Sequence, residues 1–336
     1  MHETPRTADL TPPSGSRPDG AGGPSRLLRA VTVPLMLLVG AVLALQAEVN
    51  GRFAQSLGTG SRAGIAVALV GFVIALAILA PLVAVRPGPR ADLVHVIGLV
   101  RSGEIPHTSL VGGLLGAFYI TSQGIAAGVI GVALFNVAVT AGQSVSGLLV
   151  DHAGLGPGGR QAWGLPRVVA ATAALAAVVM ATAERLVEAP VGATLLLAGL
   201  PLVAGAGLSV QQALNGRVAL RVGPLVTTFV NFVVGALGLS VALLGSLALP
   251  GQLAGLPDIG WLYVGGPLGI VYIWLAALLV RVHGVLVLGM AIIAGQVVTA
   301  VVIEWVTGTH VGPFGYLAAV VVVAGVTVAV RMKRQA

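Results

Sequence analysis

Apolar residues form long runs along almost the whole chain, and short stretches rich in Gly, Pro or Arg separate these runs. A helix needs about 20 apolar residues to cross the hydrocarbon core of a membrane, so each run is a candidate span. We predict ten spans, at residues 33–54, 63–85, 108–127, 129–150, 166–187, 191–213, 224–248, 259–280, 283–305 and 312–331. Outside them, residues 1–29 are predicted to be a disordered cytoplasmic tail and residues 333–336 a short basic tail. The pattern is typical of an all-α integral membrane protein.

Two stretches of the chain occur twice. Residues 43–58 align without a gap with residues 208–223, and seven of the 16 positions are identical. Residues 112–151 align in the same way with residues 265–304. A repeat of this length is the signature of a duplicated structural unit. We therefore predict two repeats of five spans each, at residues 30–188 and 189–332.

The composition agrees with a protein that is embedded in a bilayer. Hydrophobic residues make up 57% of the chain and charged residues 9%, and the mean hydropathy is +1.00. The net charge of +7 comes from basic residues that are scattered between apolar runs, so nucleic-acid binding is not expected. The sequence has no Cys, no His pair at metal-ligand spacing and no G-x-x-x-x-G-K-[ST] run. We therefore expect no metal and no cofactor.

The distribution of Lys and Arg predicts the orientation in the membrane. With the N-terminus in the cytoplasm, 15 of the 18 basic residues lie in cytoplasmic segments, and only Arg52, Arg62 and Arg185 lie outside. Both termini are then cytoplasmic. Because five is an odd number, the second repeat enters the membrane from the opposite side, and the two repeats are inverted. Inverted repeats are typical of transporters, whose substrate sites lie near the midplane between the repeats.

Three recurring motifs carry a resemblance to a known family. They are ALQA-xx-NGR at residues 44–52, GG-x-LG-xx-YI at residues 112–120 and AGQ at residues 141–143. With them the chain resembles the drug/metabolite transporter superfamily, and within it the YdcZ-like family of bacterial inner-membrane proteins. It looks like two five-span units of that family fused in tandem, over about residues 33–331. The aromatic residues that precede the second GG run, Trp261 and Tyr263, have no equivalent before the first.

This resemblance implies a fold and a general function. The fold would be ten spans in two inverted five-helix repeats, in the bacterial cytoplasmic membrane. The function would be solute transport, with export as the expected direction.

Polar side chains recur at equivalent positions inside the predicted spans. Gln46 and Asn50 are four residues apart and share one helical face, as do their counterparts Gln211 and Asn215. Such side chains face the bundle interior or a wet cavity. Two interpretations stay open: these amides line a translocation path, or they form hydrogen bonds that hold helices together. Further cavity candidates are the pairs Tyr119 with Tyr272 and Gln143 with Gln296. The two tyrosines could bracket an apolar or aromatic solute, and anchoring at the membrane interface is the alternative that stays open for them.

Glu48 has no counterpart in the second repeat, since Ala213 occupies the equivalent position. A carboxylate within a span suits proton coupling, because desolvation favours its protonated form. Arg52, four residues later, is also well spaced for an ion pair on the helix. We favour the ion pair.

Repeated glycines and a few unmatched polar residues have structural interpretations. Small-xxx-small spacing predicts close helix packing, within the chain or in a homodimer. The glycines concerned are Gly112, Gly116, Gly265 and Gly269. Asp151 and Glu304 end equivalent spans and are predicted to be solvated, whereas Asn231 is unmatched and is interpreted as a packing hydrogen bond.

Together these features predict a secondary transporter, not an enzyme. It would export a small metabolite or drug-like solute by alternating access, and the few charges in the spans favour a neutral or zwitterionic, partly hydrophobic solute. A passive channel and a non-transporting membrane subunit are the alternatives. An enzyme acting on lipid-linked substrates is less favoured, because the eleven acidic residues are dispersed.

Overall fold

The computed structural model describes residues 26–156, 191–248 and 250–308, with scattered residues between 159 and 176 and between 316 and 328. Most of the predicted fifth and tenth spans lies outside the described residues, as do residues 1–25 and the basic tail. The first helix begins at Arg26, so the last four residues that we assigned to the N-terminal tail are helical.

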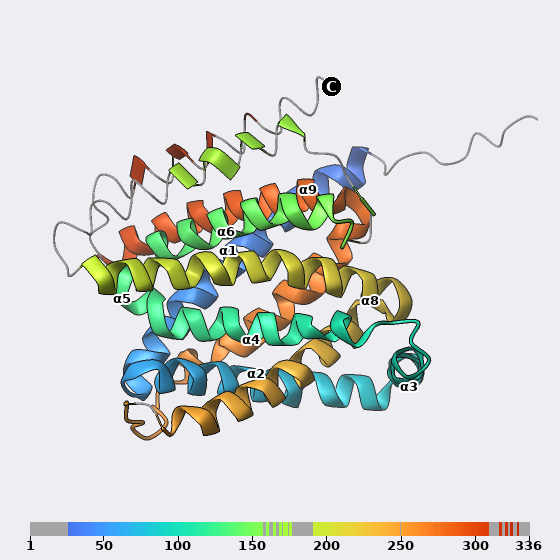
Figure 1. Ribbon diagram of the computed structural model, residues 1–336, viewed down its shortest axis with the longest axis horizontal. Coiled ribbons are helices and arrows are strands. Elements are labelled where there is room, and N and C mark those ends of the chain that lie inside the picture. The colour runs from blue at the N-terminus through green and yellow to red at the C-terminus, as the bar shows by residue number, and fades with distance from the viewer. Residues whose placement is uncertain are drawn as a thin grey trace, which may run out of the picture.

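The described chain is built from helices (Figure 1). The first part contains α1 (Arg26–Leu57), α2 (Gly60–Val85), α3 (Pro87–Arg101), the 3-10 helix η1 (His107–Val111), α4 (Gly112–Ser122), the π-helix η2 (Gln123–Ala127), α5 (Gly128–Ile130) and α6 (Val132–His152). The second part contains α8 (Val191–Ser246), the 3-10 helix η3 (Gly260–Val264) and α9 (Gly265–Thr307).

Seven segments of the described residues are long and apolar enough to cross a membrane. They are Pro34–Leu57, Gly60–Val85, His107–Ile130, Val132–His152, Gly199–Ser246, Gly260–Leu279 and Leu288–Thr307. The fifth of these has 48 residues, which make about 72 Å of helix at 1.5 Å per residue. A bilayer core of about 30 Å needs only about 20 residues, so this segment is longer than one crossing requires. The protein is therefore an all-helical, multi-pass membrane protein.

Two glycines break the long helical segments. Gly223 interrupts α8 with φ 75° and ψ 165°, and Gly131 separates α5 from α6 with φ 83° and ψ 153°. Glycine adopts such positive φ values without the steric penalty that other residues pay. Pro224 follows the first break, where a helix begins and the missing N–H is tolerated. The boundary between the spans predicted at 108–127 and 129–150 thus lies at Gly131, because the π-helix and α5 prolong the preceding segment to Ile130.

The helix α9 keeps its helical backbone from Gly265 to Thr307, and Figure 1 shows that it bends back on itself. The bend separates the two apolar segments at Gly260–Leu279 and Leu288–Thr307. The boundary between the spans predicted at 259–280 and 283–305 is therefore a bend and not an interruption of the helix.

Two pairs of helices approach each other closely in the core. In the first pair, a side chain on Gly40 of α1 would overlap the backbone carbonyl of Ile292 in α9. In the second pair, Gly205 of α8 lies against the carbonyl of Val139 in α6 in the same manner. Gly40 aligns with Gly205, and Val139 aligns with Ile292. Small residues at equivalent positions thus let helices of one repeat pack tightly on helices of the other.

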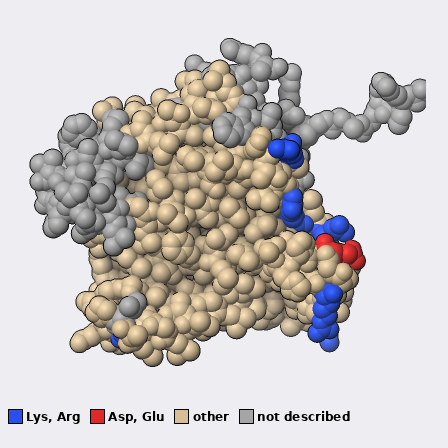
Figure 2. Space-filling model, viewed as in Figure 1, with Lys and Arg blue, Asp and Glu red and all other residues tan. Residues whose placement is uncertain are grey.

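Basic side chains gather at one end of the molecule. Figure 2 shows most of the visible Lys and Arg at the end where α3 lies, while the surface between the two ends is uncharged over a broad area. The helix α3 begins after Arg86, carries Arg90 and ends at Arg101. Between them, Val94 and Ile97 are exposed, so one face of this helix is apolar and both of its ends are basic.

Candidate functional site

The repeated amide side chains are buried in the middle of the bundle. The exposed fraction is 2% for Gln46 and 3% for Asn50 on α1, and 2% for Gln211 and 8% for Asn215 on α8. They reach this depth because α1 and α8 place residues i and i+4 on one face. The structure therefore brings the two predicted pairs to the interface between the halves.

Each amide pair lies against the glycine pair of the other repeat. A side chain on Gly265 would overlap the amide oxygen of Asn50, and one on Gly112 would lie 2.8 Å from the amide oxygen of Asn215. A side chain on Gly269 would similarly lie 3.0 Å from Nε2 of Gln46. The glycines thus do more than bring helices together, because they also leave the space that the amides occupy.

Gly116 completes the pattern. A side chain on Gly116 would collide with Nε2 of Gln211, which is the contact that corresponds to the one between Gly269 and Gln46. Each predicted packing glycine therefore has a predicted amide as its neighbour.

The amides use different hydrogen-bond partners in the two halves. Asn50 donates from Nδ2 to Oε1 of Gln123 over 2.7 Å, and Gln46 donates from Nε2 to the backbone oxygen of Gly265 over 2.7 Å. In the other half, Gln211 and Asn215 both donate to Oδ1 of Asn231, over 3.2 and 3.0 Å. Hydrogen bonds within and between helices are thus one role of these residues.

Two further residues accept hydrogen bonds from these amides: Asn231 accepts from Gln211 and Asn215, and Gln123 accepts from Asn50. Neither has a polar counterpart in the repeat alignment, because Ala276 aligns with Gln123. Gly71 holds the position that corresponds to Asn231. A side chain on Gly266 would overlap the backbone carbonyl of Gly71, and a side chain on the equivalent Gly113 would overlap the backbone carbonyl of Asn231. The lack of a repeated polar counterpart is why sequence reasoning assigned Asn231 only a packing role and did not single out Gln123.

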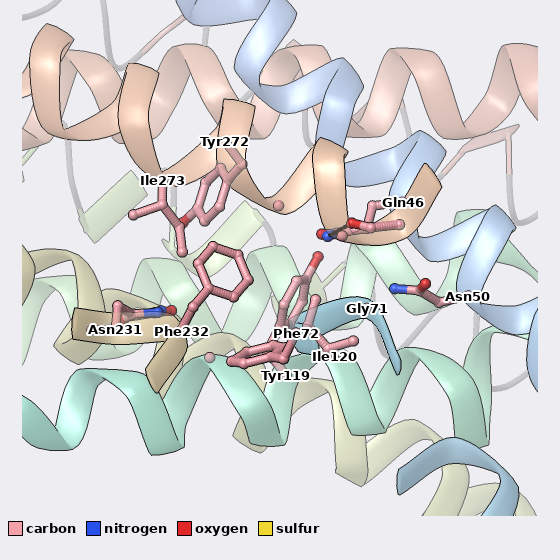
Figure 3. A pocket seen from close by; sticks show the side chains of 15 residues that line it. Gln46, Asn50, Gly71, Phe72, Tyr119, Ile120, Asn231, Phe232, Tyr272 and Ile273 are labelled. Carbon is pink, nitrogen blue, oxygen red and sulfur yellow. Dashed lines mark hydrogen bonds between the residues drawn. The ribbon is translucent and has the colours of Figure 1, made fainter. Parts of the chain in front are cut away.

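A cavity lies between the halves, and Figure 3 shows the side chains that line it. Its volume is about 20 Å³, which is enough for about one water molecule. Residues of both repeats line it, among them Gln46, Asn50, Gln211 and Asn231. A second narrow cavity adjoins it and shares Gln211 in its lining. Asn215 lines this second cavity and not the first.

Aromatic side chains from both halves line this cavity. Phe72 and Phe232 meet edge to face, with ring centroids 4.7 Å apart and planes at 64°. They follow Gly71 and Asn231 directly, so they hold corresponding positions in the two halves. Tyr119 and Tyr272 both line the cavity, and Nε2 of Gln212 donates to the hydroxyl of Tyr272 over 2.8 Å. The structure thus brings both predicted tyrosines to the site.

Gln143 and Gln296 do not belong to this site. Both are buried, but neither lines the central cavity or the one beside it. Gln296 donates from Nε2 to Oδ1 of Asn136, and the backbone oxygen of Gln143 accepts from the hydroxyl of Ser209 over 2.8 Å. The contacts of these two residues are therefore those of helix packing.

Glu48 lies outside the central cavity, in a wider polar vestibule of about 420 Å³ that it lines together with Arg52, Trp261 and Glu304. Its carboxylate accepts a hydrogen bond from Nε of Arg52, so the predicted ion pair is formed. The guanidinium carbon of Arg52 also lies 6.0 Å from the ring centroid of Trp261.

The prediction that Asp151 and Glu304 are solvated is wrong. Their exposed fractions are 6% and 4%. Oε1 of Glu304 accepts a hydrogen bond of 2.7 Å from the backbone N–H of Ala133, just after the break at Gly131. The first N–H groups of a helix have no partner within the helix, and a carboxylate at this end is stabilised. Glu304 therefore caps α6 from the other repeat.

Comparison with known proteins gives a family match and a similar fold. Residues 31–180 and residues 196–328 each match the model of a family described as "Putative inner membrane exporter, YdcZ". A solved structure, described only as the crystal structure of a protein, is similar over 93% of this chain and 99% of the other, with 18% identity and a TM-score of 0.54. This likeness shows the fold alone. No curated protein matches the chain.

Proposed function

The chain belongs to the YdcZ family of inner-membrane exporters, and from this premise we propose that it is a secondary carrier that exports a small solute by alternating access. We propose further that it has ten spans in two inverted five-helix repeats. A carrier of this kind presents one central site to each side of the membrane in turn. The observation that carries the proposal is the cavity between the halves, which amide side chains of both repeats line.

Contacts that occur twice across the interface support inverted repeats. Gly295 lies against the carbonyl of Leu37, and its counterpart Gly142 lies against the carbonyl of Leu202. Leu37 and Leu202 are also equivalent, so a half-turn rotation would exchange the two contacts. In Figure 1, α1 and the first half of α8 run in opposite directions along the molecule. Such an arrangement is expected for a rotation axis in the membrane plane.

The charge distribution supports cytoplasmic termini. The beginning of α1 lies at the same end of the molecule as α3, and most of the visible Lys and Arg gather there (Figure 2). Cytoplasmic segments of membrane proteins carry an excess of these residues. We therefore assign this end to the cytoplasm.

Labelling of single cysteines tests the inverted topology. The natural chain has no Cys, so each variant carries one reactive thiol. Ser56 and Leu220 are exposed and lie just beyond Arg52 and Arg217, the equivalent arginines of the two repeats. A membrane-impermeant maleimide is expected to label S56C in intact cells and L220C only after permeabilisation. Labelling of both from one side would exclude inverted repeats.

Transport in proteoliposomes tests the carrier function. Purified protein is reconstituted and assayed with radiolabelled metabolites, with and without a proton or sodium gradient. Saturable flux that responds to a gradient is expected of a carrier. An ohmic current would instead show a channel, and no flux of any solute would contradict transport altogether.

A further inference from the structure

We propose that the central cavity binds an uncharged, flat ring compound that carries both hydrogen-bond donors and acceptors on its edge, as a neutral nucleobase does. The proposal rests on the carrier function proposed above and gives the chemistry of its solute.

The absence of charge is the first argument. Among the described residues that line the central cavity and the adjoining one, none is Asp, Glu, Lys, Arg or His. The charged side chains lie instead in wider pockets, Glu48, Arg52 and Glu304 in the vestibule and Arg217 with Arg221 in another. An ion or a zwitterion would lose its hydration in the cavity without gaining an opposite charge. The site therefore selects an uncharged solute.

Unused amide atoms are the second argument. Gln46 donates a hydrogen bond from Nε2 to the backbone oxygen of Gly265, and its Oε1 has no hydrogen-bond partner within the described part of the chain. Because Gly265 offers an acceptor there, the opposite amide orientation would place two oxygens together. The orientation of Gln46 is thereby determined, and a buried acceptor remains free.

Asn231 presents the complementary atom. Its Oδ1 accepts from both Gln211 and Asn215, while its Nδ2 has no partner among the described residues. Gln46 and Asn231 are 2% and 3% exposed, and both line the cavity. An unpaired buried amide atom is unfavourable, because it has lost its hydrogen bonds to water and gained none in the protein. A solute that donates to Gln46 and accepts from Asn231 removes both penalties.

The aromatic side chains give the shape of the solute. Phe72, Phe232, Tyr119 and Tyr272 line the same cavity, and in Figure 3 the two phenylalanines lie between Gln46 and Asn231. Flat rings stack on such side chains or meet them edge to face. The cavity is narrow in this conformation, so a ring enters as the halves separate, which is the motion that alternating access requires.

Binding to the wild-type protein tests each element of the proposal separately. The probes are radiolabelled uracil and three competitors of similar size, with the protein in proteoliposomes. 1,3-Dimethyluracil is flat and uncharged but has no N–H donor, orotate adds a carboxylate to the same ring, and 5,6-dihydrouracil is not flat. We expect saturable binding of uracil, with each competitor binding about tenfold more weakly or worse. Equal binding of orotate or dimethyluracil, or no binding of uracil, would overturn the proposal.

Variants connect the binding to the two amides. Q46L and N231L are each expected to weaken uracil binding about tenfold, since one hydrogen bond to the solute is lost, and to leave the weak binding of dimethyluracil almost unchanged. The matched control is T140V, which replaces a buried hydroxyl that also has no partner among the described residues but lies outside the cavity. It is expected to bind uracil as the wild type does. If N231L does not fold, Q46L and the competitor series still test the proposal.

The same vesicles separate this proposal from the carrier function. Gradient-driven, saturable flux of orotate or another charged solute, without flux of uracil, would leave a carrier whose solute is not the one proposed. No flux and no binding with any solute would reject both proposals.

Discussion

The two halves of the central cavity have equivalent backbones but unequal hydrogen bonds. In the first half, Gln46 and Asn50 find separate acceptors, a backbone carbonyl and the side chain of Gln123. In the second half, Gln211 and Asn215 share one acceptor, Asn231. The same two-residue motif is therefore satisfied in two ways.

The difference shows which contacts a duplicated bundle must keep. The glycines against which the amides lie occur in both repeats, because any larger side chain at these positions would overlap the neighbouring amide. The amide partners differ, since several side chains or a backbone oxygen can satisfy a donor. Close helix approach is thus the stricter constraint, and the following predictions test this ranking.

The largest effect is expected at the helix crossings. G205L would push α8 away from the carbonyl of Val139 and is expected to destabilise the fold by at least about 3 kcal/mol, as is its counterpart G40L. The control is G245L, because Gly245 has only open space around it among the described residues. Size-exclusion chromatography and thermal unfolding in detergent measure the effect. If G40L and G205L differed strongly, the equivalence of the crossings would be lost.

A smaller effect is expected at the amide partners. N231L leaves two buried donors without an acceptor and is expected to cost about 2–4 kcal/mol, whereas Q123L leaves one and is expected to cost about 1–2 kcal/mol. The free energy of unfolding in mixed micelles measures both. Equal losses of unfolding free energy in the two variants would show that Asn231, although two donors share it, contributes no more to stability than Gln123 does.

The cap on α6 is expected to contribute about 1 kcal/mol. E304A removes the acceptor for the N–H of Ala133, while E304Q keeps an oxygen in its place and is expected to lose less. The unfolding temperature of the two variants measures the difference. If E304Q were as unstable as E304A, the carboxylate charge rather than the hydrogen bond would stabilise the cap.

The smallest effect on stability is expected at the ion pair of Glu48 and Arg52, which has no equivalent in the second half. The side chain of Arg52 is 44% exposed, and exposed pairs contribute about 0.5 kcal/mol or less. E48Q is expected to unfold at almost the wild-type temperature and to keep the pH dependence of transport. Loss of that pH dependence would assign proton coupling to Glu48.

Much of this arrangement was predictable because it repeats. The motifs around Gln46 and Gln211 and around Gly112 and Gly265 occur twice, and the structure places them at one interface. Gln123 was missed, and Asn231 was interpreted only as a packing hydrogen bond, because their counterparts in the repeat, Ala276 and Gly71, have no polar atom in the side chain. The prediction for Glu304 failed because a position at the end of a span does not show which helix terminus lies opposite.

The sequence by itself determined a membrane-embedded helical protein with two related halves, because bilayer thickness limits the length of apolar runs and duplication leaves matching residues. It also identified the amides and glycines that recur at equivalent positions in the two halves. Only the tertiary structure decided that Phe72 meets Phe232, that Gln143 and Gln296 lie outside the cavity, and that Oε1 of Gln46 and Nδ2 of Asn231 have no hydrogen-bond partner among the described residues. The physical reason is that hydrogen-bond satisfaction depends on which side chains meet across helices, and this depends on crossings that local sequence does not encode.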